Sequence, residues 1–161
     1  MTKTPEIQFE DFFSEVIADN KEFVANINET LSKDGYKTKI ESKASGLFMS
    51  YSHPKTKKVF FNVFFRKNGL FARIYADNFG KYPDFLDRLP ENMVKEIGKS
   101  PTCKRLTDPT TCNQKCMMGY DFYVRGNNYK KCRMSCFQFS VNSESIPVLV
   151  EFVEKERKER Q

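Results

Sequence analysis

The cysteines of this chain are confined to one stretch. All five lie between Cys103 and Cys136, in the spacing C-x8-C-x3-C-x15-C-x3-C. In a reducing compartment, clustered cysteines are more often metal ligands or reactive thiols than disulfides, and an odd number cannot all pair within one chain. We therefore expect the fold to carry a cysteine-rich insert, which we place at residues 100–136.

The cysteine spacing favours a structural zinc site. Zinc in such sites is held tetrahedrally by four thiolates or imidazoles, often supplied as close pairs. Cys112 and Cys116 form one such pair, and Cys103 can reach it from the preceding loop. Cys132 is the predicted fourth ligand because its basic KKCR surroundings favour a thiolate, and Cys136 is the alternative. Reduced cysteines without a metal, and disulfide or redox roles, are the competing interpretations.

Positive charge is concentrated in the same stretch. The formal net charge is +6, and residues 103–136 contain seven lysines and arginines against two aspartates. Basic side chains neutralise phosphates and tyrosines stack on unpaired bases, so this mixture predicts a hairpin that binds nucleic acid or another polyanion. The candidate residues are Lys104, Arg105, Arg125, Lys130, Lys131, Arg133, Tyr123 and Tyr129. The alternatives are a charged, solvated surface and a zinc-held insert that contacts a protein partner.

The apolar pattern predicts an α+β fold of a kind common among small bacterial domains. Apolar residues at helical spacing predict an N-terminal pair of helices, the first with Phe12, Val16 and Ile17 on its buried face. The first is expected to begin at Thr4-Pro5. Alternating segments then predict antiparallel strands at residues 36–43, 46–52, 58–66 and 70–76.

The second half of the chain is expected to add short helices, a hairpin and a last helix. Short helices are predicted around residues 82–89 and 90–98, and the last helix after residues 142–144. Between them, the hairpin is expected to turn at Gly126-Asn127-Asn128. Together these elements predict an antiparallel sheet of about five to six strands in a single domain, residues 1–161.

The strand KVFFNVFFR at residues 58–66 carries large side chains on both faces. Because strand side chains alternate, Phe61 and Phe65 share one face, and Phe60 and Phe64 share the other. We expect both faces to be covered, with the remaining helices of the chain covering the second one, since monomers rarely expose large apolar patches. The alternative is that one face is an exposed binding surface.

The sequence favours a non-enzymatic cytoplasmic protein. His53, the only histidine, precedes a proline in a predicted turn, and there is no glycine-rich phosphate loop or H-E-x-x-H motif. An enzyme with a cysteine-based or small-molecule site is the second alternative, after the protein-interaction module. No apolar run has the length of a signal peptide or membrane span, so no membrane partner is expected.

Overall fold

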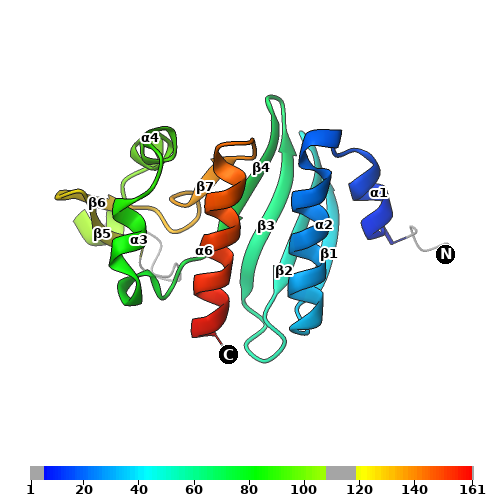
Figure 1. Ribbon diagram of the computed structural model, residues 1–161, viewed down its shortest axis with the longest axis horizontal. Helices are drawn as coiled ribbons and strands as arrows, with labels where there is room; N and C mark the ends of the chain where they lie inside the picture. Colours follow the sequence, from blue (N-terminus) through cyan, green and yellow to red (C-terminus); the bar gives the residue numbers. More distant parts are fainter. Residues whose placement is uncertain (1–5, 108–118, 161) are drawn as a thin grey trace. The chain divides into compact units, whose positions relative to one another are not determined.

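The computed structural model describes residues 6–107 and 119–160 (Figure 1). Contacts divide the chain into two compact units. The first unit comprises Met1–Ala72 and Ser140–Ile146, and the second comprises Arg73–Phe139 and Pro147–Gln161. The division passes through strand β4, strand β7 and helix α6. The single-domain assignment of residues 1–161 stays a prediction.

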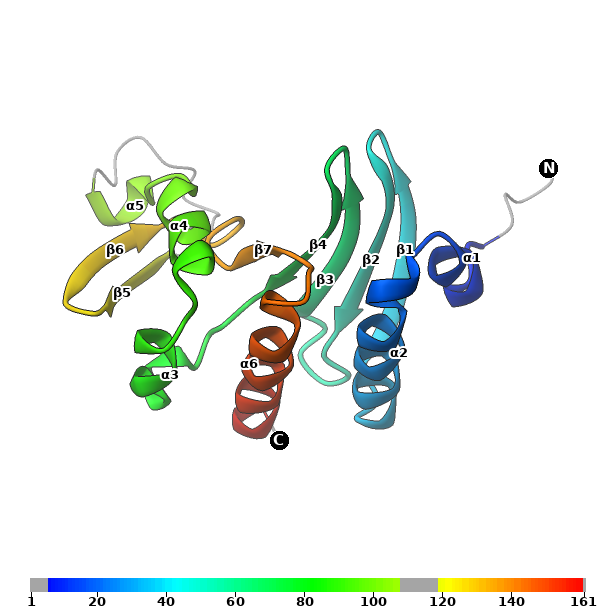
Figure 2. The same cartoon turned by 45° about the horizontal axis from the view of Figure 1, so that its top comes forward.

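The first unit is built from two helices and the first strands of an antiparallel sheet (Figure 2). The register is regular, with Lys37 opposite Ser52 at one end of the first hairpin and Lys43 opposite Gly46 at the other. The elements are α1 (Phe9–Ser14), α2 (Ala18–Lys33), β1 (Lys37–Lys43), β2 (Gly46–Ser52), β3 (Val59–Arg66) and the start of β4 (Gly69–Ile74).

The N-terminal helix pair is confirmed, but two of its details differ from the prediction. Helix α1 begins at Phe9, where Gln8 and Asp11 form a reciprocal capping box. The predicted start at Thr4-Pro5 lies outside the described residues. Ile17, expected on the buried face, is 64% exposed because it is the N-cap of α2 and no longer follows the period of α1.

Helices α1 and α2 pack on one face of the first unit's sheet. Phe12 of α1 contacts the ring of Phe65, and Asn28 of α2 accepts a hydrogen bond from the hydroxyl of Tyr51. Along β2, Met49 and Tyr51 on this face are buried, whereas the five remaining residues of the strand are all half-buried. Helices α1 and α2 thus cover one face of this sheet, and the expectation that the remaining helices cover the other face stays a prediction.

The second unit combines short helices, a two-stranded sheet and an aromatic core. Phe137 lies at the centre of that core, in ring contact with Phe79, Tyr120, Phe122 and Phe152. The elements are η1 (Phe79–Lys81), α3 (Pro83–Asp87), α4 (Glu91–Lys99), α5 (Lys104–Thr107), β5 (Tyr120–Val124), β6 (Asn127–Lys131), β7 (Gln138–Ser140, shared with the first unit) and α6 (Ser145–Glu159, mostly in this unit).

The turn of the β5–β6 hairpin begins one residue earlier than predicted and ends two residues earlier. Its register pairs Val124 with Asn127, which leaves Arg125 and Gly126 as the turn. Both turn residues have positive φ, 49° and 84°, as a two-residue hairpin turn of the primed type requires. The predicted turn at Gly126-Asn127-Asn128 is thus corrected, because the asparagines belong to β6.

The α+β prediction is confirmed at the level of the sheets and terminal helices. A five-stranded antiparallel sheet has the order β1-β2-β3-β4-β7, and β5 and β6 form a separate two-stranded sheet. The metal-stapled insert is not shown, because residues 108–118 lie outside the described part of the chain. Among the described residues, no helix combines the length and hydropathy needed to cross a membrane.

Candidate functional site

Two of the predicted zinc ligands, Cys103 and Cys132, lie on neighbouring extended segments. Thr102 forms a β-bridge with Lys131, and the backbone N–H of Cys132 donates to Pro101 at 2.8 Å. Side chains alternate along each segment, so Cys103 and Cys132 share the face opposite to that of Thr102 and Lys131. The Sγ atom of Cys103 accepts the backbone N–H of Gly119 at 3.3 Å.

The alternative ligand, Cys136, is placed differently from the prediction. The segment after β6 is a turn and not a strand, and the N–H of Cys136 donates to the carbonyl of Cys132 at 3.0 Å. Cys136 is fully buried, and burial raises the pKa of its thiol well above the ordinary value. A buried, protonated thiol is a poor metal ligand.

The predicted metal site is only partly covered by the described residues. Cys112 and Cys116 lie outside the described residues. Within residues 6–107 and 119–160, no three His, Cys, Asp or Glu side chains form a group that could hold a metal ion. A site that uses Cys103 and Cys132 would therefore need further ligands from outside the described residues, where Cys112 and Cys116 lie, and zinc stays a prediction.

Three cations of the predicted polyanion-binding set make internal contacts. The guanidinium of Arg125 donates to the carbonyls of Asp87 and Leu89, and Lys131 donates to the carbonyls of Gly98 and Ser100 at 3.0 Å. Arg133, whose side chain is only 10% exposed, forms an ion pair with Asp77. These three side chains are thus engaged by groups of the second unit.

The other candidate residues do not share one face. Tyr123 and Lys130 lie on the exposed face of the hairpin, where Lys130 is opposite Asp121. Tyr129 lies on the other face and stacks on Phe122 with ring centroids 5.6 Å apart. Lys104 is exposed on α5, and the side chain of Arg105 lies outside the described part of the structure.

One depression does bring three of the candidate residues together. It has a volume of about 400 Å³ and contains no acidic side chain. Its lining residues are Gly98, Thr102, Thr107, Asn128, Tyr129, Lys130 and Lys131.

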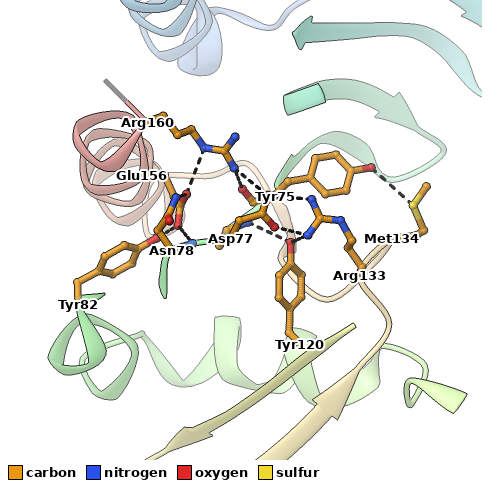
Figure 3. Close-up of polar contacts among 10 residues, drawn as sticks. Tyr75, Asp77, Asn78, Tyr82, Tyr120, Arg133, Met134, Glu156 and Arg160 are labelled. Carbon is orange, nitrogen blue, oxygen red and sulfur yellow. Dashed lines mark hydrogen bonds and ion pairs between the residues drawn. The ribbon is translucent and has the colours of Figure 1, made fainter. Parts of the chain in front are cut away.

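A buried polar cluster in the second unit was not predicted from the sequence (Figure 3). Glu156 is fully buried and accepts hydrogen bonds from the backbone and side-chain nitrogens of Asn78 at 2.9 and 3.1 Å. It also accepts from the hydroxyl of Tyr82 and from Nε of Arg160 at 3.2 Å. Arg160 also forms an ion pair with Asp77, and Asp77 forms a second ion pair with Arg133.

The charges of this cluster balance. Burial by itself would raise the pKa of Asp77, but the hydrogen bonds and charges of Arg133 and Arg160 outweigh it and hold the pKa below its ordinary value. Burial raises the pKa of Tyr82, and the neighbouring Glu156 carboxylate raises it further. Two carboxylates thus face two guanidiniums, and the oxygens of Glu156 are already occupied. This arrangement is typical of a structural cluster and not of a catalytic carboxylate.

A groove lies on the second face of the first unit's sheet, the face that α1 and α2 leave uncovered. Its volume is about 410 Å³. Phe48, Phe64 and Phe71, from three successive strands, form its floor, and Ser45 and Lys67 come from the tight turns of the β1–β2 and β3–β4 hairpins. The full lining is Ser45, Phe48, Phe64, Arg66, Lys67, Asn68 and Phe71. We call it the sheet-face groove.

The phenylalanines of the sheet-face groove form a stacked row. The ring centroids of Phe48 and Phe64 are 5.0 Å apart at 19°, and those of Phe64 and Phe71 are 6.2 Å apart at 18°. The guanidinium carbon of Arg66 lies 5.1 Å from the ring centroid of Phe64 and 5.9 Å from that of Phe71. Lys43 is placed in the same way, 5.9 Å from the ring centroid of Phe48.

Neither family models nor curated proteins nor solved structures gave a match to this chain. The functional argument therefore depends on the geometry of the described residues.

An exposed binding face of the sheet was one of the alternatives that the sequence offered, whereas the buried cluster was not predicted. Glu156 continues the buried helical spacing of Leu149, Phe152 and Val153, which places an acid at a core position. The sheet-face groove could be found only from the strand register, because its three phenylalanines come from separate strands.

Proposed function

We propose that this chain is a non-enzymatic protein-interaction module and that the sheet-face groove is where its partner binds. The observation that carries this proposal is the apolar row of Phe48, Phe64 and Phe71 on the face that α1 and α2 leave open. Phe48 and Phe71 are partly exposed, and a row of large apolar side chains on an open sheet face is typical of an interaction surface.

The geometry of the β5–β6 hairpin also supports the choice of an interaction module over a polyanion-binding hairpin. A polyanion site needs cations that are free to meet phosphates on one surface. Arg125, Lys131 and Arg133 instead donate to groups of the second unit.

Site-specific photo-crosslinking tests the proposal. A benzoylphenylalanine at position 71 should crosslink a protein in lysate of the cells that express this chain, and the same residue at position 17 should not. Ile17 is the matched control because it is exposed and apolar but lies at the N-terminus of α2, away from the sheet-face groove. Equal crosslinking at both positions, or a crosslinked product whose added mass is removed by nuclease, would contradict the proposal.

Polyanion binding at the hairpin is our second candidate function, and the depression lined by Tyr129, Lys130 and Lys131 favours it. Single-stranded RNA should then bind at low salt and dissociate steeply as salt is raised. Lys130→Gln should weaken that binding, whereas Arg125→Gln should affect it less because Arg125 is held by Asp87 and Leu89. Absence of RNA binding at about 50 mM salt would remove this candidate.

We also propose that structural zinc holds the insert through Cys103, Cys112, Cys116 and Cys132. The shared face of Cys103 and Cys132 supports this, as does the N–H donated to Cys103 Sγ. Elemental analysis of protein purified without chelator should find about one zinc per chain. Cys132→Ser should lose the metal and Cys136→Ser should retain it; equal loss in both variants would leave the choice of the fourth ligand unsupported.

A further inference from the structure

The cations around the sheet-face groove indicate the charge of what binds there. Among the described residues, neither Arg66 nor Lys67 forms an ion pair with a carboxylate. Glu41, which lies on β1 opposite Phe48, already contacts two lysines, with its oxygens 3.2 Å from Lys39 and 3.5 Å from Lys43. The rim of the groove therefore carries positive charge that nothing nearby neutralises, and this favours an anionic partner.

The packing of the rings indicates which class of anion fits. Phe64 is 2% exposed because its two ring faces are turned toward Phe48 and Phe71. Nucleic-acid bases bind aromatic side chains by stacking on their faces. Here the central faces are occupied, and the guanidinium of Arg66 lies over Phe64 and Phe71. A row of this kind offers ring edges, against which aliphatic side chains pack, and these edges carry partial positive charge.

We propose that the sheet-face groove binds an acidic peptide segment that also carries apolar side chains. This inference rests on the proposed function and names the chemistry of the partner. Carboxylates of the segment pair with Arg66 and Lys67, its apolar side chains pack on Phe48 and Phe71, and its polar backbone reaches Asn68 in the turn. The exposed cations set the orientation and charge preference, and the phenylalanine row supplies the buried apolar area.

The experiment uses a short fluorescent peptide that alternates glutamate and leucine as the probe. Titration of the full chain at low salt should show binding that weakens as ionic strength rises. Replacement of the glutamates by lysine, or of the leucines by serine, should each weaken binding by about tenfold or more. An oligothymidylate of equal length should bind more weakly than the peptide. Backbone amide shifts should be confined to residues 45–48 and 64–71.

Matched variants place the binding on the groove. Lys67→Gln and Arg66→Gln should each weaken peptide binding by about threefold to tenfold. Lys55→Gln should leave it unchanged, since Lys55 makes the same charge change in the turn between β2 and β3, at the opposite end of these strands. Lys67 and Lys55 are exposed turn residues, so unaltered thermal unfolding will confirm that both variants fold.

The outcomes separate this inference from the proposed function. Equal weakening by Lys55→Gln and Lys67→Gln, or tighter binding of the oligothymidylate, would overturn the acidic-peptide assignment. If a protein still crosslinks at position 71 in that case, the interaction module stands and its partner has another chemistry. If the crosslink at position 71 is absent as well, the proposed function fails with it.

Discussion

Glu156 shows how much a single buried side chain contributes to this fold. Its carboxylate is fully enclosed and accepts hydrogen bonds from three residues, one of which is the cationic Arg160. A charge in such a place is tolerated only when each of its oxygens is matched by donors. The position is therefore sensitive even to an isosteric change.

We expect Glu156→Gln to destabilise the protein by about 3 kcal/mol, because an amide NH₂ would face existing donors and Arg160 would lose one of its two carboxylate partners. The matched control is Glu154→Gln on the same helix, which breaks a partly exposed pair with Arg157 at 3.2 Å. That change should cost less than about 0.5 kcal/mol. Urea unfolding of both variants measures the difference, and equal effects would contradict a special role for Glu156.

Cys136 should be the least reactive of the described thiols. It is fully buried, and burial raises its pKa, so little thiolate is present at neutral pH. Brief treatment of the metal-free native protein with iodoacetamide, followed by mass spectrometry, should modify the half-buried Cys132 before Cys136. Modification of Cys136 first would show that its surroundings open readily.

At the scale of elements, the tight turns of the first unit depend on glycine in different ways. Gly46 and Gly69 both have positive φ, 136° and 122°. A Cβ at Gly46 would also meet the Cβ of Phe65 at 2.8 Å, whereas a Cβ at Gly69 would meet nothing within 4 Å. The first position is thus restricted by backbone conformation and by packing, and the second by conformation alone.

We expect Gly46→Ala to lower stability more than Gly69→Ala, by a further ~1–2 kcal/mol from the clash with Phe65. Both variants share the cost of a side chain at positive φ, so their difference isolates the steric contribution. Thermal unfolding measures it. Equal melting temperatures would mean that the neighbouring strand shifts at little cost.

The elements also show why part of the fold could be read from the sequence and part could not. The alternation in residues 58–66 correctly indicated apolar residues on both faces of β3, because that pattern is local. The turn of the β5–β6 hairpin was misplaced because Arg125 adopts a positive φ that non-glycine residues disfavour, and its guanidinium is held by hydrogen bonds to Asp87 and Leu89. The sheet-face groove and the buried cluster join distant segments, which no local pattern reveals.

For the molecule as a whole, acid should weaken the fold through Asp77. Its pKa is held below the ordinary value of 3.8 in the folded state, so its contribution is fully present above that value. The contribution is lost as pH falls from 3.8 through the lower folded pKa, while the net charge of +6 becomes more positive. Asp77→Asn should flatten the decline of melting temperature in this range. An unchanged acid slope in Asp77→Asn would assign the loss to other carboxylates.

Unfolding of the whole chain tests the single-domain prediction. The boundary between the two compact units runs inside β4, β7 and α6, so neither unit contains all of its elements intact. We expect one urea transition, seen equally by far-ultraviolet and near-ultraviolet circular dichroism. Two separated transitions would show that the units unfold independently.

The placement of the groove's cations at hairpin ends also bears on how this protein can evolve. Lys67 and Asn68 are turn residues, and Arg66 is the last residue of β3, whereas the rings beneath them belong to strand interiors. Exposed turns tolerate substitution far better than packed strands do. If the groove binds the proposed peptide, its charge preference can therefore change through substitutions at a few exposed turn positions while the strands beneath stay the same.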